Sequence, residues 1–130
     1  MLLGVARGDT SVDGERLASK VANLRIFQNV QGRFDRSLLD TDGAVLVVSQ
    51  FTLIADTAKG NRPSFSDAAP ADEAEPVYDA FCETLRGLGI EVATGVFGER
   101  MRVELVNDGP VTIILEPSAR AGRAAPTAPA

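Results

Sequence analysis

Apolar residues recur with the period of an α-helix near the start of the chain. Leu17, Val21 and Leu24 lie three or four positions apart with alanines between them, so one face of a helix would be apolar. Thr10 and Asp13 precede this face at the spacing of an N-capping pair. The pattern therefore predicts a helix over Asp13–Leu24 that buries one side.

A second helical pattern occupies the middle of the chain. Val77, Phe81, Leu85 and Leu88 line one face. Pro76 suits the first turn of a helix, because its missing N–H needs no partner there. Since glycines follow at positions 87 and 89, we expect this helix to end near Leu88.

Runs of β-branched and other apolar residues predict strands. Residues 44–53 are nearly all apolar, which is typical of a central strand covered on both faces. Residues 2–5 favour the end of a buried strand. Further strands are expected over residues 90–97, 102–106 and 111–116. The order β-α-β-α-β-β-β indicates one mixed α/β domain over residues 1–116, with one or two sheets.

Polar and glycine-rich segments separate these elements. Gln28–Asp35 is typical of a loop, and Asp40–Gly43 of a turn. Residues 56–71 form a long loop with no evident secondary structure, and such loops are often functional. Residues 117–130, rich in alanine, proline and arginine, cannot bury a face, so we expect a disordered tail.

The composition changes this picture mainly by what it lacks. The 130 residues include no histidine, which excludes Ser-His-Asp and Cys-His catalysis and argues against a zinc site. The single cysteine, Cys82, fits a reducing compartment, and its place on the second helix favours a core residue over a nucleophile. Any chemistry must come from carboxylates, hydroxyls, backbone dipoles or the substrate itself.

Charge is distributed unevenly along the chain. The net charge of -5 argues mildly against an extended nucleic-acid footprint. Six acids and no base lie in residues 67–83, whereas five bases and four acids lie in residues 25–62. An acidic helix could dominate the total while a near-neutral face meets an anion, although such charge runs are also ordinary on a wet surface.

Polar residues end the apolar strand at Ser49, Gln50, Phe51 and Thr52. These side chains either pair with neighbouring backbone as the strand passes from core to rim, or present hydroxyls and backbone N–H groups to a ligand carbonyl, as in an oxyanion hole. Thr52 as a nucleophile is the weaker option, because no base is available to activate it.

Two further stretches are candidates. Asn107-Asp108-Gly109-Pro110 favours a hairpin turn, but a cis Gly-Pro bond would also form a rigid wall able to reject a substrate by shape. Phe97 and Met101, beside glycines, are either core residues or a surface that stacks on a base. In the long loop, Arg62 could pair with phosphate or with a nearby acid.

Taken together, these stretches resemble the D-aminoacyl-tRNA deacylase family of bacteria and eukaryotes. The resemblance covers about residues 2–116, and the order of SQFTL before NDGPVT is highly specific. The matching segments are LLGVARGDT at 2–10, NLRIF at 23–27, SQFTL at 49–53, ADTAKGNRPSFSDAAP at 55–70, GVFGERM at 95–101 and VELVNDGPVT at 103–112.

The resemblance implies mixed β-sheets, or a barrel-like sheet, packed with two main helices. It implies a homodimeric cytoplasmic enzyme, without metal or other cofactor, that hydrolyses the ester of D-amino acids mischarged on tRNA and of glycine mischarged on alanine tRNA. Ser49–Thr52 would line the pocket for the 3′-terminal aminoacyl-adenosine, and Phe97 and Met101 would flank the adenine. Gly109 and Pro110, joined by a cis bond, would enter the partner's pocket and exclude L-side chains.

The family is thought to use the 2′-hydroxyl of the tRNA in place of a protein base, with backbone N–H groups near Phe51 and Thr52 stabilising the oxyanion. Its members usually begin about thirty residues earlier with a β-hairpin, so this chain is expected to expose a sheet edge. Two alternatives stay open. One is a related deacylase with a trans Gly-Pro bond that acts on small L-amino acids, and the other is a truncated, inactive remnant that binds tRNA ends.

Overall fold

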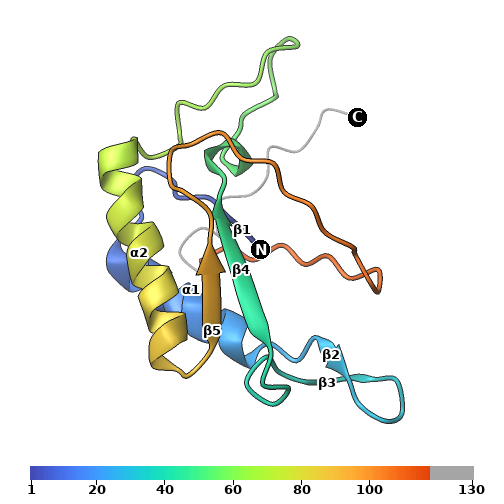
Figure 1. Ribbon diagram of the computed structural model, residues 1–130. Helices are drawn as coiled ribbons and strands as arrows, with labels where there is room; N and C mark the ends of the chain where they lie inside the picture. The colour runs from blue at the N-terminus through green and yellow to red at the C-terminus, as the bar shows by residue number, and fades with distance from the viewer. Residues whose placement is uncertain (118–130) are drawn as a thin grey trace.

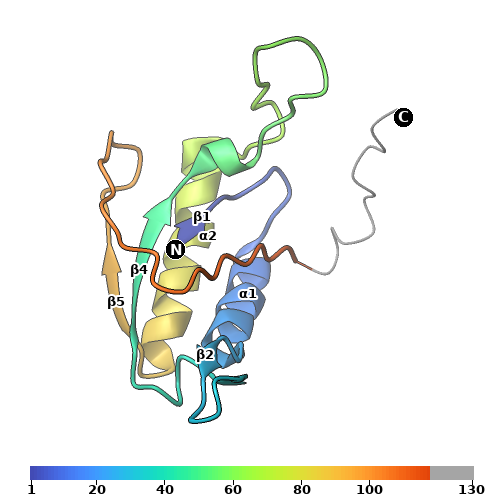
Figure 2. The ribbon, with the colours of Figure 1, turned by 90° about the vertical axis from the view of Figure 1, so that its right-hand side faces the viewer.

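The computed structural model describes residues 1–117 as a parallel sheet with two helices against one face (Figures 1 and 2). Its central strand β4 (Ala44–Ser49) pairs with β1 (Leu2–Leu3) on one side and with β5 (Glu91–Thr94) on the other. A separate two-stranded antiparallel sheet completes a mixed α/β fold with two main helices, as expected. Apart from Pro117, the expected tail lies outside the described residues.

The core lies between the parallel sheet and the helix pair α1 (Ser11–Asn23) and α2 (Ala71–Gly87). Both views show the two helices side by side. They approach closely at Gly14, where an added Cβ would lie 3.0 Å from the carbonyl oxygen of Val77. The buried residues of the main cluster are Leu3, Ala18, Ala22, Leu38, Val47, Tyr78, Phe81, Cys82, Leu85 and Ile90.

Helix α1 begins where its capping residues predict. The Thr10 hydroxyl accepts the Asp13 backbone N–H at 3.4 Å, and the Asp13 carboxylate accepts the Thr10 N–H at 2.8 Å. This reciprocal pairing satisfies two donors that a helix start leaves unpaired. The helix therefore starts at Ser11 and ends at Asn23, close to the predicted Asp13–Leu24.

The start predicted for α2 was wrong. The helix begins at Ala71, so Pro76 lies inside it rather than in its first turn. The N–H groups of Glu73 and Ala74 bond to the Pro70 carbonyl at 3.0 and 2.9 Å. Asp72 and Glu73 place negative charge beside the positive end of the helix dipole. This first turn outweighs the backbone hydrogen bond that Pro76 cannot make.

Residues 28–35, predicted as a loop, contribute to a β-hairpin. Strand β2 (Phe27–Gln28) pairs antiparallel with β3 (Phe34–Arg36). The side-chain oxygen of Asn29 accepts the N–H groups of Gln31 at 2.9 Å and Arg33 at 3.1 Å. One polar side chain thus closes a turn that the apolar pattern does not reveal.

The strands predicted near the C-terminus are wrong in part. Strand β5 covers four residues of the predicted 90–97, while residues 102–106 and 111–116 form no strand. Within residues 1–117, the segment 102–117 makes one backbone hydrogen bond, from the Asp108 N–H to the Val106 carbonyl. Figure 1 shows it in orange to red, turning away from the body and returning past the N-terminus. A strand-like sequence stays unpaired there because no other strand of residues 1–117 lies beside it to supply hydrogen bonds.

Candidate active site

The residues that the sequence singles out lie at the end of β4 and in the turn that follows it: Ser49 and Gln50 are half-buried, and Phe51 and Thr52 are exposed. The Gln50 N–H donates to the Leu3 carbonyl at 2.8 Å, so β1 holds the end of β4 in place. The chain then forms a short 3-10 helix, η1 (Phe51–Leu53), where the predicted strand was expected to continue. The Gln50 side-chain amide donates to the Thr52 hydroxyl oxygen. The side chains of Gln50 and Thr52 therefore pair with each other rather than with the backbone of a neighbouring strand.

The turn contains two adjacent backbone N–H groups, those of Phe51 and Thr52, that are not used in its own hydrogen bonds. The N–H groups that close the turn are the next two: that of Leu53 bonds to the Gln50 carbonyl at 3.2 Å, and that of Ile54 bonds to the Phe51 carbonyl at 3.0 Å. The N–H groups of Phe51 and Thr52 make no hydrogen bond within the part of the chain that the structure describes. Phe51 is 58% exposed and Thr52 is also exposed. The turn can therefore offer two neighbouring N–H groups to an oxygen that gains negative charge.

Gly4 supports this turn and was not identified as a site residue from sequence. A Cβ on Gly4 would lie 3.1 Å from both the Gln50 carbonyl oxygen and the Leu53 Cβ. The glycine therefore lets β1 pass directly against η1. The available signal was a glycine interrupting an apolar strand run, which often marks a close backbone approach.

The long loop is ordered where it meets η1. Phe65 contacts Phe51 edge to face, with ring centroids 5.3 Å apart. Asp56 and Ser64 exchange two backbone hydrogen bonds of 2.8 Å, and the Asp56 carboxylate accepts the Ala58 N–H at 2.9 Å. The predicted loop 56–71 is thus largely a closed arm followed by the start of α2.

The remaining predicted site residues lie in different surroundings. Phe97 is half-buried and packs against both core clusters, and the centroid of its ring lies 5.6 Å from that of Tyr78. This favours a core role for its ring. The Met101 thioether lies against Gly95, where no Cβ would fit. Met101 is therefore held by the loop that also contains Phe97.

Gly109 and Pro110 are exposed, and the peptide bond between them is cis. The three atoms nearest to a Cβ built on Gly109 all belong to Val111. Figure 1 shows their segment turning away from η1. A single chain therefore does not bring this turn onto Ser49–Thr52.

No group of the turn Ser49–Thr52 has a shifted pKa, whereas two side chains of the core do. Burial raises the pKa of Tyr78 to about 12 and also raises the pKa of the Cys82 thiol. Cys82 is buried in the main cluster, which confirms its interpretation as a core residue. Across residues 1–117, no three histidine, cysteine or acidic side chains gather as a metal site would require. None of the helices in this part of the chain has the length and apolarity to cross a membrane.

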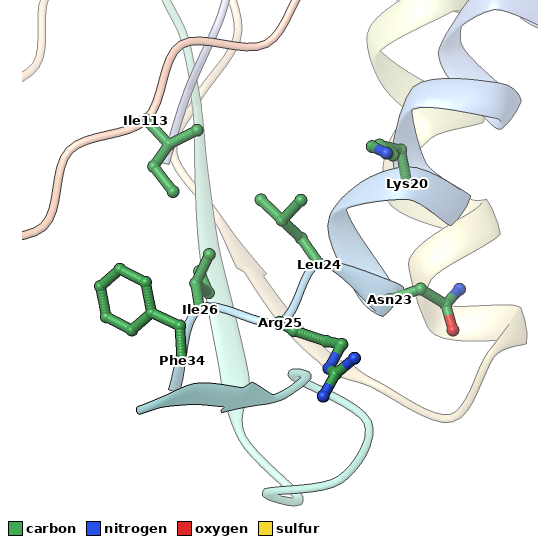
Figure 3. A pocket seen from close by; sticks show the side chains of 7 residues that line it. All are labelled: Lys20, Asn23, Leu24, Arg25, Ile26, Phe34 and Ile113. Atoms are coloured by element: carbon green, nitrogen blue, oxygen red, sulfur yellow. The ribbon is translucent and has the colours of Figure 1, made fainter. Parts of the chain in front are cut away.

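A groove of about 450 Å³ lies elsewhere, between the end of α1, the β-hairpin and Ile113 (Figure 3). The side chains of Leu24, Ile26, Phe34 and Ile113 form its apolar part, and Lys20 and Asn23 of α1 and Arg25 just after the helix complete its lining. None of the predicted site residues lines it. The groove is therefore separate from the turn after β4.

Comparison with known proteins gives a consistent result. The family model for D-Tyr-tRNA(Tyr) deacylase matches residues 1–116. A D-aminoacyl-tRNA deacylase of Roseiflexus sp. (strain RS-1) is 60% identical over 116 residues, covering 89% of this chain and 75% of that protein. The same-named protein of Opitutus terrae (strain DSM 11246 / JCM 15787 / PB90-1) is 56% identical over 121 residues, covering 92% and 81% of the two chains.

Two solved structures have the same fold. The c-Myc DNA Unwinding Element Binding Protein is 41% identical with a TM-score of 0.80, covering 88% of this chain and 78% of its own. A probable eukaryotic D-amino acid tRNA deacylase is 18% identical with a TM-score of 0.63, covering 75% and 72%. The second likeness shows the fold alone.

Proposed function

This chain belongs to the D-Tyr-tRNA(Tyr) deacylase family, whose activity is hydrolysis of the D-aminoacyl-tRNA ester, and we propose that the turn Ser49–Thr52 is where this reaction takes place. The observation that carries the proposal is the pair of adjacent Phe51 and Thr52 N–H groups without a partner among the described residues. Both belong to an exposed turn that β1 holds in place. A preorganised pair of donors is what acyl transfer requires.

The proposed reaction uses these two donors. Water adds to the ester carbonyl carbon, and the carbonyl oxygen becomes an oxyanion that the two N–H groups stabilise. The bond to the 3′ oxygen then breaks, which releases the D-amino acid and leaves a 3′-hydroxyl on the tRNA. The tRNA 2′-hydroxyl orients the attacking water and relays its proton to the departing 3′ oxygen, because the chain has no histidine to act as a base.

Thr52 serves this mechanism as a positioning residue rather than as a nucleophile. Its hydroxyl oxygen accepts a hydrogen bond from the Gln50 amide, which lowers rather than raises the electron density available for attack. A nucleophilic hydroxyl needs a neighbouring base, and none contacts Thr52 within the described residues. The Gln50–Thr52 pair instead fixes the shape of the turn.

Selectivity is assigned to Gly109 and Pro110 of a second copy in a homodimer. In one chain both residues are exposed, so this turn is available to another subunit. Its carbonyl groups would occupy the space of an L-side chain. Because exclusion by shape acts on the side chain, glycine on alanine tRNA would also be accepted. Met101, with Phe97 behind it, would form the adenine side of the pocket.

The first test compares D-Tyr-tRNA with L-Tyr-tRNA. Rapid hydrolysis of the D-ester alone is expected. Equal rates on both esters, or hydrolysis of neither, would contradict the proposal. The Thr52→Ser variant keeps a hydroxyl for Gln50 and should retain most activity, whereas Thr52→Val removes the acceptor and should lower kcat.

The second test asks whether the site is shared between subunits. Gln50→Ala damages the turn, and Gly109→Val blocks the pocket that the Gly-Pro turn enters. In an equal mixture of the two variants, half the dimers are mixed and each contains one intact site, so activity should recover to about a quarter of wild type. If the mixture stays as inactive as the separate variants, the turn is not lent to a partner.

A further inference from the structure

We propose that the arm formed by residues Asp56–Ser64 binds backbone phosphates of the single-stranded 3′ end of the tRNA. The inference rests on the proposed function, because it assigns a role beside the same site. Figures 1 and 2 show the arm standing out from the end of the molecule that carries η1. It emerges from η1 and returns beside it, so its base lies next to the turn proposed for hydrolysis.

The base of the arm is fixed. The paired hydrogen bonds between Asp56 and Ser64, each 2.8 Å, close it like a short hairpin. The edge-to-face contact between Phe65 and Phe51 joins that closed base to η1. Because the tip is tied at both ends, a ligand bound there keeps a defined position relative to the Phe51 and Thr52 N–H groups.

The tip of the arm is cationic. Lys59 and Arg62 are exposed, and neither makes an ion pair within residues 1–117. Asp56 is the only acid in the arm, and one of its carboxylate oxygens accepts a hydrogen bond from the Ala58 N–H. Just beyond the base, the Arg7 guanidinium donates to the Ser66 carbonyl at 2.7 Å, which ties the end of the loop to the segment after β1. Lys59 and Arg62 thus place two positive charges at the tip of the arm in a protein with a net charge of -5.

The neighbouring surface has the opposite charge. Five acids lie along α2, at Asp72, Glu73, Glu75, Asp79 and Glu83, and Arg86 is the one base in that helix. A polyanion would be repelled from α2 and attracted to the arm. The ester of an aminoacyl-tRNA is joined to the terminal nucleotide, so the phosphates of the preceding nucleotides must lie near the site. Charge complementarity and this covalent connection both indicate that the arm binds the phosphates of the tRNA 3′ end.

The experiment compares two substrates that carry the same ester. D-Tyr-tRNA contains the phosphates, whereas D-tyrosyl-adenosine does not. In the double variant Lys59→Ala/Arg62→Ala, the ratio of kcat/KM for D-Tyr-tRNA to that for D-tyrosyl-adenosine should fall about tenfold. The salt dependence of tRNA binding should weaken by about 1.4 in log–log slope, from about 0.7 for each lost phosphate contact on a single strand.

The control is Lys20→Ala/Arg33→Ala, which removes the same charge far along the chain from the arm, on α1 and in the hairpin turn. Its substrate ratio should equal that of wild type. A similar fall in both double variants would reduce the effect to net charge and overturn the assignment, as would no fall in the arm variant.

Failure of the proposed function gives a different result. If wild type hydrolyses neither ester, that function is wrong. Binding of uncharged tRNA, measured in the same variants by fluorescence anisotropy, then tests whether the arm contacts the phosphates. A dissociation constant about tenfold higher in the arm variant than in the control supports it, and equal constants overturn it.

Discussion

Two regions of this molecule have similar apolar patterns but differ in how far their apolar side chains are buried. In the body, Phe81 and Val47 are fully buried between the sheet and the helices. In the segment 102–117, Leu105 is 74% exposed and Val106 is 90% exposed. Alternating apolar residues therefore favour a strand, but a strand forms only where another one supplies hydrogen bonds and a face to bury against.

The largest expected effect comes from the body. Phe81→Ala should lower the free energy of unfolding by about 3–5 kcal/mol, because it removes a fully buried ring and leaves a cavity. The matched control is Phe34→Ala, since Phe34 is 54% exposed on the hairpin. Urea denaturation followed by circular dichroism measures both. Similar losses in the two variants would mean that the hairpin is as tightly packed as the core.

Tyr78 tests a polar contact inside the same core. Its hydroxyl donates to the Val47 carbonyl at 2.8 Å and so links α2 to β4. Tyr78→Phe keeps the ring and should cost about 1–2 kcal/mol, from the lost hydrogen bond and the partly unsatisfied carbonyl. The same denaturation measurement applies, with Phe34→Tyr as an exposed control. No loss in Tyr78→Phe would indicate that the carbonyl finds another donor.

The pH dependence follows from the same residue. Burial raises the pKa of Tyr78 from its usual 10 to about 12, because the charged phenolate is disfavoured in the core. The folded protein then holds this proton more tightly than the unfolded chain. The contribution to stability is complete below pH 10 and is lost as pH rises toward 12. Denaturation midpoints across this window should fall more steeply in wild type than in Tyr78→Phe, and parallel profiles would contradict the shift.

A smaller effect, on activity, is expected at Gly4, where the body of the protein supports the turn. In Gly4→Ala, the new Cβ presses on the Gln50 carbonyl and on Leu53, each 3.1 Å away. The turn must shift by a few tenths of an ångström, and we expect kcat/KM to fall about tenfold, which corresponds to about 1.4 kcal/mol. Gly87→Ala is the control, because nothing lies within 4 Å of a Cβ there. Unchanged kcat/KM in Gly4→Ala would show that the turn tolerates displacement.

The sequence predicts best where one local signal decides the structure. The range of α1 follows from its apolar spacing and its Thr10–Asp13 cap. The start of α2 was misplaced because Pro76 suggested a first turn, while the backbone bonds that begin the helix at Pro70 are not visible in an apolar pattern. The hairpin was missed because Asn29, a single polar side chain, closes it.

Long-range geometry is what the sequence does not contain. The polar residues at the end of β4 were predicted as a site, and the structure leaves Ser49 and Gln50 half-buried while it exposes Phe51 and Thr52 in a short 3-10 helix. The support from Gly4 became visible only when β1 and η1 were brought together. Strands were predicted over residues 102–106 and 111–116 because β propensity is local, whereas the pairing that makes a strand is not.

The smallest effect on stability should come from the exposed segment, and it completes the comparison. Val106→Ser removes apolar surface that is already in water, so at low protein concentration the free energy of unfolding should change by less than about 0.5 kcal/mol. The proposed insertion of Gly109 and Pro110 into the pocket of a second copy requires this segment to contact that copy, so the same change should weaken self-association. Sedimentation velocity over a range of concentrations measures self-association directly, with Val12→Ser on the exposed face of α1 as the control. An unfolding loss of several kcal/mol in Val106→Ser would place its side chain in a packed environment within one chain. Equal dimerisation in both variants would instead remove Val106 from the subunit contact.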